Sequence, residues 1–333
     1  MSDILAQISP QRSTQYSNIA SALAPAELRL SPLGQATSSI DTVTLCSKEY
    51  LKFSINDGTM DDFVLYELGN LSMTNSFFYY YEYLGSITGP FLKPIEIPEN
   101  HSLAYDLIMT RRYKGKTNEM FTHFLCNVAR YSSGFSDRKW SNIRLFDPLA
   151  GGGTTLFTAL YLGAETVGIE KNSKDVQSTV AFLKQYTKEQ DIPCIFKEER
   201  LKKSINKYWF HIGREKQRCI IVNGDTADSA CLISGVKKPH CIVTDLPYGI
   251  QHGGRITDLL TRAIPVWSTV LVPGGSIVMS WDSSRFSRKE MINLIRDVSS
   301  LKIFDGDIYE NMAHRVDRVI KERDVIVGKV EQF

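Results

Sequence analysis

Four short apolar segments, each ending in an acidic residue, recur in the middle of the chain and restrict the folds open to it. They are LFD, VGIE, IIVNGD and IVTD, which end at Asp147, Glu170, Asp225 and Asp245. Helical patterns follow the first two segments, and strands that alternate with helices predict a doubly wound sheet of mainly parallel strands. Because the carboxyl ends of parallel strands share one edge of a sheet, we expect the four acids to gather there.

The same alternation continues towards the C-terminus. A helix, a strand, a second helix and two final strands are predicted at residues 255–275, 276–281, 287–298, 302–310 and 316–330. The last two strands have no helix between them, so we expect a hairpin that places an antiparallel strand in the sheet. The pattern therefore predicts an α/β domain over residues 105–333, with a Rossmann-like, seven-stranded sheet that is parallel except for one strand.

The first third of the sequence differs from this domain in composition. Residues 1–25 are polar, and we expect a flexible, loosely ordered N-terminus. Residues 26–104 are rich in β-branched and aromatic residues that Gly and Pro interrupt, as in IDTVTLCSKEYLKFSI. Such segments are typical of short strands, so we predict a small β-rich or α+β domain there. It contains no recognisable catalytic motif.

Composition narrows the classes of protein that fit. The chain has 39 Lys and Arg against 37 Asp and Glu, so a surface for nucleic acid would have to be local. Its six cysteines form no CxxC pair and no zinc-like cluster with histidine, so we expect reduced thiols and no metal. We find no apolar run of membrane-spanning length and no signal peptide. A cytoplasmic protein with no membrane partner is the simplest expectation.

A glycine-rich loop, FDPLAGGGTTL (residues 146–156), follows the first strand and opens a helix. Its three consecutive glycines let the backbone turn sharply and approach a ligand closely. A P-loop would need a lysine before the threonines, and the loop has none. A dinucleotide-binding loop would need glycine where Leu156 stands, and it would leave Asp147 and residues 244–248 without a role.

S-adenosylmethionine fits this combination of residues better, because it has a ribose and an adenine but no phosphate. The glycine loop would lie beside its amino-acid moiety. Glu170, about twenty residues after the loop, is placed to accept hydrogen bonds from both ribose hydroxyls. Asp225 suits a polar role near the adenine. The sequence therefore predicts an S-adenosylmethionine site at the carboxyl edge of the sheet.

The segment TDLPYGIQHGG (residues 244–254) ends the fourth strand in a way that suits amine chemistry. The exocyclic amine of a nucleobase is a poor nucleophile because its lone pair is delocalised, and two acceptors on its N–H bonds would localise that pair as methyl transfer begins. Asp245 can supply a carboxylate and Leu246 a backbone carbonyl. Pro247 would fix the turn, and the Tyr248 ring would lie against the base. The alternative is an Asx-type turn with a surface tyrosine.

These motifs resemble those of a known family. FDPLAGGGTT is similar to the DPFxGxGTT loop of nucleic-acid amino-methyltransferases, and DLPY is similar to their D/N-P-P-Y/F motif. The loop precedes the D-x-P-Y motif, as in the RNA enzymes and the adenine-N6 DNA enzymes of this group. IVTDLPYG is nearer to the tRNA guanine-N2 methyltransferases, in which an apolar residue between Asp and Pro is familiar. Residues 105–333 thus resemble a class I S-adenosylmethionine-dependent amino-methyltransferase, whereas the first hundred residues show no THUMP domain, the usual RNA-capture module.

The resemblance also implies cofactor contacts outside the glycine loop. RRYKGKTNEMFTHFL (residues 111–125) is similar to the segment that these enzymes place over the methionine end of the cofactor. It implies contacts from Thr117 and Phe121, for which a simple helix start is the alternative. The expected cofactor-binding residues are then Thr117, Phe121, Asp147, Ala150, Gly151, Gly153, Glu170 and Asp225.

Residues 196–218 do not fit the alternation of strands and helices. This segment, FKEERLKKSINKYWFHIGREKQR, lies where a short loop would suffice, and it is biased towards Lys and Arg with three aromatic residues among them. It is either a solvated insertion with some apolar anchoring or a basic arm that contacts phosphates.

The function expected from these features is N-methylation of an exocyclic amine in RNA, with guanine-N2 in tRNA as the first candidate. The β-rich N-terminal domain and residues 196–218 would then bind the RNA backbone. Two alternatives remain. One is a DNA adenine-N6 methyltransferase, and the other is a non-catalytic RNA-binding or scaffold protein that retains the fold.

Overall fold

A computed structural model describes most of the chain. The described residues are 3–10, 19–56, 58–113, 115–202, 205–247, 253–316 and 322–331. The chain forms two compact units, one of residues 1–100 and 306–322 and the other of residues 101–305 and 323–333. A segment between the last two strands of the larger unit therefore belongs to the smaller one. The predicted single domain over residues 105–333 did not include this exchange.

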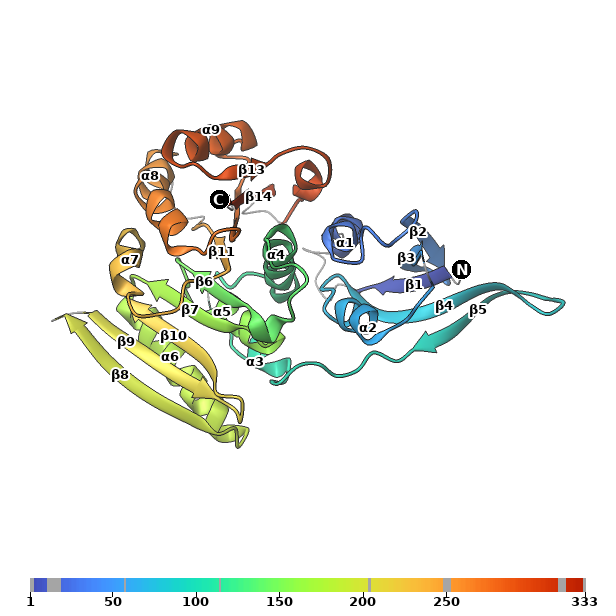
Figure 1. Ribbon diagram of the computed structural model, residues 1–333, viewed down its shortest axis with the longest axis horizontal. Coiled ribbons are helices and arrows are strands. Elements are labelled where there is room, and N and C mark those ends of the chain that lie inside the picture. The colour runs from blue at the N-terminus through green and yellow to red at the C-terminus, as the bar shows by residue number, and fades with distance from the viewer. Residues whose placement is uncertain are drawn as a thin grey trace. The chain divides into compact units, whose positions relative to one another are not determined.

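An antiparallel sheet forms the smaller unit, in the strand order β2-β3-β1-β4-β5 (Figure 1). Its strands are β1 (Asp3–Ile8), β2 (Asp41–Leu45), β3 (Lys48–Ser54), β4 (Thr74–Leu84) and β5 (Ile87–Ile95). Its helices are α1 (Ile19–Leu30), α2 (Asp62–Gly69) and the 3-10 helix η4 (Asp307–Met312). Helix α1 packs against η4, which joins residues 306–322 to this unit.

Strand β1 is central in this sheet, so the expectation of a loosely ordered N-terminus was wrong for residues 3–8. It pairs with β3 on one side and β4 on the other, and Ile4, Leu5 and Ala6 are all buried. A strand that is covered on both faces carries consecutive apolar residues, and it lacks the alternation that marks a half-buried strand. Helix α1 begins at Ile19, within the same predicted segment.

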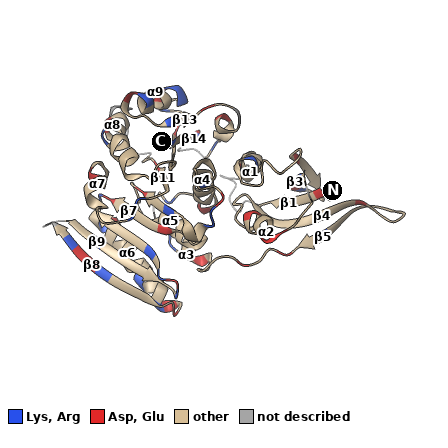
Figure 2. Ribbon diagram, viewed as in Figure 1, with Lys and Arg blue, Asp and Glu red and all other residues tan. Residues whose placement is uncertain are grey.

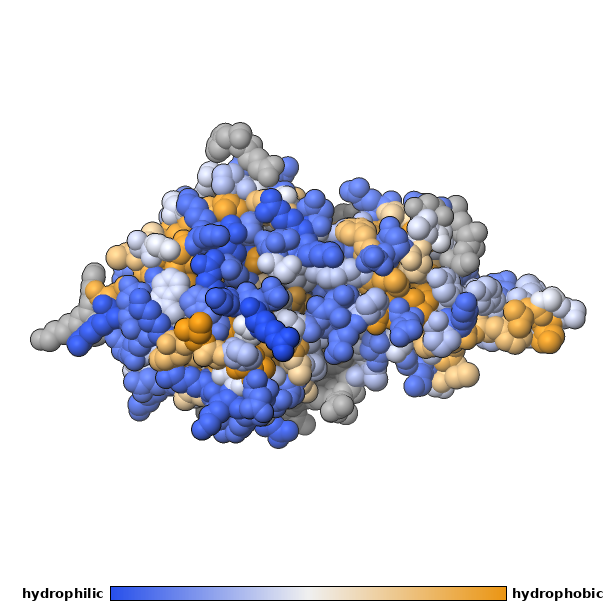
Figure 3. All heavy atoms as spheres, turned by 60° about the horizontal axis from the view of Figure 1, so that its bottom comes forward, coloured by the Kyte–Doolittle hydropathy of each residue, from blue (hydrophilic) through white to orange (hydrophobic). Residues whose placement is uncertain are grey.

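Strands β4 and β5 continue beyond the rest of the sheet as a two-stranded ribbon. The pairing of β4 with β1 ends at Tyr80, whereas its pairing with β5 continues to Leu84. Tyr83, Leu84 and Ile87 are exposed at 63%, 58% and 61%, and Figure 3 shows apolar residues gathered at this tip. Exposed apolar side chains of the smaller unit are therefore concentrated at the end of the ribbon.

Nine strands form the sheet of the larger unit, in the order β13-β14-β12-β11-β6-β7-β10-β9-β8. They are β6 (Arg144–Asp147), β7 (Glu165–Glu170), β8 (Cys194–Lys202), β9 (Ile205–Ile212), β10 (Gln217–Asn223), β11 (Cys241–Asp245), β12 (Ser276–Asp282), β13 (Lys302–Phe304) and β14 (Arg323–Lys329). Strands β14 and β9 run antiparallel to both neighbours, and the pairs from β12 to β10 are parallel. The predicted seven strands with one antiparallel strand were therefore too few.

The two additional strands fold from the segment that the sequence had set apart as an insertion or a basic arm. Strand β9 pairs with β10 and β8 pairs with β9, so the segment extends the sheet. Tyr208 and Phe210 are buried in the core, and Phe196 packs against it. Figure 2 shows acidic as well as basic residues along β8. The charges had hidden two strands with apolar residues on both faces, since Leu201, Ile205 and Trp209 pack on the opposite face of the sheet.

Two apolar cores cover the two faces of the large sheet. Along β10, Ile220 and Val222 belong to one core, and Cys219 and Ile221 belong to the other, as alternation along a strand requires. The first core is covered by α7 (Ser229–Leu232), α8 (Gly253–Val270) and α9 (Arg288–Val298), of which α8 and α9 lie together in Figure 1. The second is covered by α3 (Asp106–Met109), α5 (Thr154–Leu162) and α6 (Ser173–Glu189). Helix α4 (Glu119–Ser132) packs against α5 and β12.

Candidate functional site

A cavity of about 500 Å³ lies at the carboxyl edge of the large sheet, where β6, β7 and β11 end. It is lined by Tyr113, Gly115, Thr117, Thr122, Leu125, Asp147, Leu149, Ala150, Gly151, Gly152, Thr154, Thr155, Glu170, Asp245, Leu246 and Pro247. The glycine loop, the acid at the end of β7 and the Asp-Leu-Pro turn after β11 therefore border one space. Residues from the segment before α4 and from α4 itself complete the lining.

The glycine loop takes a backbone shape that other residues would strain. Gly151 and Gly153 have φ angles of 48° and 88°, in the left-handed region that favours glycine. Gly152 is restricted by space instead, because a Cβ there would lie 2.3 Å from the ring of Tyr113. The Tyr113 hydroxyl forms a hydrogen bond with Thr154 at the start of α5. The tyrosine thus lies directly on the loop.

Glu170 is oriented by two backbone groups. Its Oε2 accepts a hydrogen bond from the Gly151 N–H at 2.9 Å, and its Oε1 accepts one from the Asn172 N–H at 2.6 Å. An ionised carboxylate has about four lone-pair sites, so each oxygen can still accept a further hydrogen bond. The carboxylate is held at the cavity wall and retains the capacity to bind a diol.

Asp147 is a buried carboxylate at the end of β6, with only 2% of its surface exposed. Its Oδ1 accepts a hydrogen bond from the Leu149 N–H at 3.0 Å. Burial raises the pKa of Asp147 to about 7, although hydrogen bonds from Thr155 and Leu149 act in the opposite direction. Within the described residues, no basic side chain forms an ion pair with it. The site therefore holds a carboxylate that a bound cation would stabilise in its charged form.

Asp245, at the end of β11, is held by three side chains. Thr117 donates a hydrogen bond to its Oδ2 at 2.6 Å, and Ser280 donates one to its Oδ1. The guanidinium of Arg323 lies 3.8 Å from Oδ2 and is 97% buried at the side chain. The Leu246 N–H donates to the Ser280 carbonyl at 2.9 Å, which fixes the turn after the strand. Asp245 is thus both oriented and supplied with a nearby positive charge.

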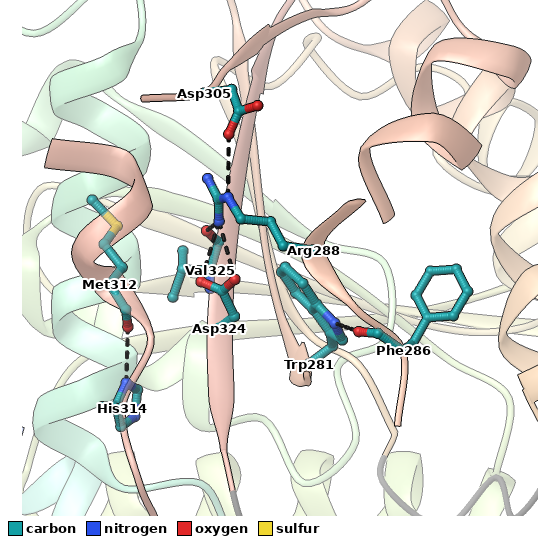
Figure 4. A network of polar contacts seen from close by, with 8 residues as sticks. All are labelled: Trp281, Phe286, Arg288, Asp305, Met312, His314, Asp324 and Val325. Atoms are coloured by element: carbon teal, nitrogen blue, oxygen red, sulfur yellow. Dashed lines mark hydrogen bonds and ion pairs between the residues drawn. The ribbon is translucent and has the colours of Figure 1, made fainter. Parts of the chain in front are cut away.

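Arg323 reaches this position because β14 is anchored at its start. In Figure 4, Arg288 of α9 donates to the Asp324 carboxylate at 3.2 Å, to the Val325 carbonyl at 3.0 Å and to Asp305 at 3.2 Å. The Arg323 guanidinium also lies 4.9 Å from the ring centre of Phe121. Contacts on both sides of residue 323 therefore fix the cation beside Asp245.

The structure gathers most, though not all, of the predicted site residues around the cavity. Phe121 is fully buried and packs under the Arg323 guanidinium instead of lining the cavity. Asp225 caps the turn after β10 and forms an ion pair with Lys171 at 2.9 Å, and it is not among the lining residues. Gly153 is also outside the lining, at the start of α5. Tyr248 lies outside the described residues, so its predicted role stays a prediction.

Several residues of the site were not among those predicted from the sequence. Tyr113, Thr122, Thr155, Ser280 and Arg323 line the cavity or hold one of its carboxylates. Tyr113 and Thr122 lie within residues 111–125, whose resemblance to a cofactor segment pointed to that region. Arg323 and Ser280 reach the site only through the pairing of β11, β12 and β14, which no local pattern reveals.

Comparisons with known proteins give distant matches in backbone architecture. No family model and no curated protein matches the chain. The magnesium protoporphyrin IX methyltransferase of Synechocystis PCC 6803, solved with bound SAM, is 10% identical over 66% of this chain and 87% of its own, with a TM-score of 0.40. Precorrin 8w decarboxylase of Methanobacterium thermoautotrophicum is 16% identical over 65% and 92%, with a TM-score of 0.37. A TehB-like SAM-dependent methyltransferase of Corynebacterium glutamicum is 11% identical over 57% and 80%, with a TM-score of 0.35.

Two absences hold for the described part of the chain. No group of three or more His, Cys, Asp or Glu residues could hold a metal ion. No helix is both long enough and apolar enough to cross a bilayer.

Proposed function

We propose that the chain is an S-adenosylmethionine-dependent N-methyltransferase that acts on the exocyclic amine of a nucleobase in RNA, with N2 of guanine in tRNA as the first candidate. One observation carries the proposal. Asp245, Leu246 and Pro247 line the same cavity as the glycine loop and Glu170. A strand end suited to polarising an amine therefore borders a space suited to the methyl donor.

The cavity residues fit S-adenosylmethionine in size and in donor chemistry. A volume of about 500 Å³ is within the usual range for a site of a cofactor of this size. Glu170 can accept hydrogen bonds from a ribose diol, and Asp147 is a carboxylate without a basic partner in the described chain, which suits an ammonium group. When bound, the sulfonium makes its methyl group electrophilic.

The chain's own residues would then prepare the amine. A carboxylate oxygen of Asp245 and the carbonyl oxygen of Leu246 can each accept one N–H of the amine, so the nitrogen lone pair is freed from the ring. As the amine took up the methyl group that the cofactor would supply, positive charge would develop on its nitrogen beside the Asp245 carboxylate. The displaced proton can pass to an oxygen of the same carboxylate. Thr117, Ser280 and Arg323 would keep Asp245 in position throughout.

The choice of RNA depends on the motif and not on the cavity. The likeness of IVTDLPYG to the tRNA guanine-N2 enzymes supports a guanine amine, while the same two acceptors would serve adenine-N6 in DNA. A scaffold protein would need neither acceptor. We keep the DNA enzyme and the non-catalytic protein as outcomes that the next experiment can reveal.

The protein should be incubated with methyl-labelled S-adenosylmethionine and either total RNA or genomic DNA, followed by nucleoside mass spectrometry. We expect label in N2-methylguanosine from the RNA. Label in N6-methyldeoxyadenosine would replace the RNA proposal with the DNA one. Measurable cofactor binding with no label in either pool would exclude the methyltransferase proposal in favour of the scaffold.

Cofactor binding should be measured separately by calorimetry. Glu170→Ala removes the proposed ribose ligand, and we expect the affinity for S-adenosylmethionine to fall by about tenfold to a hundredfold, as for the loss of charge-assisted hydrogen bonds. Glu189→Ala, an exposed carboxylate at the end of α6, is the matched control. Equal affinities for the two variants would remove the ribose assignment.

A further inference from the structure

A second cavity lies at the opposite edge of the large sheet, where the parallel strands begin. It has a volume of about 450 Å³ and is lined by Arg138, Ser141, Asn142, Ile143, Arg144, Glu165 and Lys237. Arg144 and Glu165 are the first residues of β6 and β7 and are register partners. Asp147, which lines the cofactor cavity, is at the other end of β6, about 10 Å along the strand. The two cavities are therefore separate sites.

The charges around this second cavity do not cancel. Glu165 is its one acidic lining residue, and Arg218 already neutralises it through two hydrogen bonds of 2.9 and 2.6 Å. In the described chain, neither Arg138, Arg144 nor Lys237 forms an ion pair with a carboxylate. Three cations thus face one space whose single lining carboxylate is already bound to a fourth cation.

His240 offers no acceptor to the Nη groups of Arg138 and Arg144, although Arg144 Nε donates to the Lys238 carbonyl at 2.7 Å. The Arg144 backbone N–H donates to His240 Nδ1 at 3.0 Å, so a neutral ring must carry its proton on Nε2. Arg144 Nη2 lies 3.1 Å and Arg138 Nη1 lies 3.5 Å from that same Nε2. Burial and the two arginines lower the pKa of His240 to about 4, so the ring is neutral near pH 7. The Nη donors of both arginines therefore converge beside a ring N–H instead of a lone pair.

We propose that this cavity binds a phosphate group. Guanidinium and ammonium groups together supply the hydrogen bonds and the charge that phosphate oxygens require, and Ser141 and Asn142 add neutral polar groups at the wall. The phosphate belongs either to an RNA backbone or to a small phosphorylated molecule. The first source rests on the proposed function, since it gives the substrate a second contact remote from the methylated base.

Phosphate binding can be tested with a double variant of exposed residues, Arg138→Ala with Lys237→Ala. Lys289→Ala with Lys302→Ala removes the same charge from exposed positions on α9 and β13, and it is the control. Inorganic phosphate is titrated into each protein at low ionic strength and followed by phosphorus NMR. We expect the dissociation constant to rise about tenfold in the cavity variant and less than twofold in the control. Equal changes in the two variants would overturn the proposal.

A second titration identifies the source of the phosphate. Bulk tRNA labelled with a fluorophore is titrated by anisotropy over a range of salt concentrations. If the cavity contacts an RNA backbone, the cavity variant weakens binding and lowers the slope of log affinity against log salt by about 0.7 to 0.9, as expected for one lost phosphate contact. If only inorganic phosphate binding falls, the site serves a small phosphorylated molecule.

The affinity of the same variants for S-adenosylmethionine separates this proposal from the proposed function. We expect it to be unchanged, because the cavity is at the other end of β6. A protein that binds phosphate at this cavity but transfers no methyl group would leave the phosphate site standing and refute the proposed function. If the protein transfers methyl groups but the cavity variant changes neither phosphate nor tRNA binding, the proposed function stands and the phosphate site is refuted.

Discussion

Two carboxylates at the ends of neighbouring strands line one cavity, yet their surroundings differ. Asp147 ends β6 and is almost fully buried, and burial raises its pKa to about 7. Asp245 ends the adjacent β11 and has Arg323 at 3.8 Å, with Thr117 and Ser280 on its two oxygens. One acid thus has a protein cation beside it, whereas the other forms no ion pair in the described chain.

The difference indicates a division of roles. A buried carboxylate without a basic partner gains most from a ligand that brings a positive charge, so Asp147 suits cofactor binding. A carboxylate that is already oriented and compensated gains little from such a ligand and is available to accept hydrogen bonds from a neutral amine. The proposed chemistry therefore places binding on β6 and catalysis on β11.

The largest expected effect is on Asp245. Asp245→Asn keeps the shape but loses the charge that would stabilise the developing cation, so we expect methyl transfer to fall by about a thousandfold. The affinity for S-adenosylmethionine should change by less than about threefold. Asp258→Asn, an exposed acid on α8, is the control. If the Asp245→Asn variant loses cofactor affinity as well as turnover, the assignment of Asp245 to catalysis alone is contradicted.

Asp147→Asn should weaken cofactor binding more than catalysis. We expect the dissociation constant for S-adenosylmethionine to rise by about fiftyfold, because a charge-assisted contact is lost, with a smaller effect on turnover at saturation. In the wild type the affinity should also fall as pH decreases below about 7, where Asp147 takes up a proton. The Asn variant should lack this pH dependence when both are measured by calorimetry from pH 5 to 8.

The same group affects folding stability with a defined sign. The pKa of Asp147 is raised from 3.8 to about 7 in the folded chain, so the native state binds more protons than the unfolded state between these values. Stability from this group is present at low pH and is lost as pH rises through the window. Relative to Asp147→Asn, the ligand-free wild type should lose roughly 3 kcal/mol of unfolding free energy between pH 5 and 8. Urea denaturation of both proteins at pH 5 and pH 8 checks this. The prediction is contradicted if the difference in unfolding free energy between them is the same at both pH values.

Local patterns predicted one part of this site better than the other. The glycine loop and Glu170 belong to a strand–loop–helix–strand sequence, so their neighbourhood follows from chain order. The partners of Asp245 do not, because Thr117 is 128 residues away and Arg323 arrives through β14. The charged residues of segment 196–218 also concealed two strands. Strand β9 packs Tyr208 and Phe210 against one core and Trp209 against the other, but the Lys, Arg and Glu residues around it resemble a solvated loop.

Arg323 tests whether compensation of Asp245 matters. Arg323→Met fills the buried space without the charge, and we expect turnover to fall by about tenfold while the Michaelis constant for the cofactor changes little. Arg323→Lys restores a cation and should recover part of the loss. A purely structural role would instead give the two variants equal turnover, with a lower Tm accounting for the loss in both.

Substitution of Tyr113 should give the smallest change in cofactor affinity, and it tests how the wall of the glycine loop contributes to binding. Tyr113→Phe loses the hydrogen bond to Thr154 but keeps the ring that packs on Gly152, so we expect cofactor affinity to fall by less than about threefold. Gly152→Ala places a Cβ 2.3 Å from that ring and must displace it, which should weaken affinity more than the loss of the hydroxyl. Calorimetry on both variants checks the order. If the hydroxyl proves more important than the ring, then Tyr113 acts on the ligand through its oxygen and not as a wall of the glycine loop.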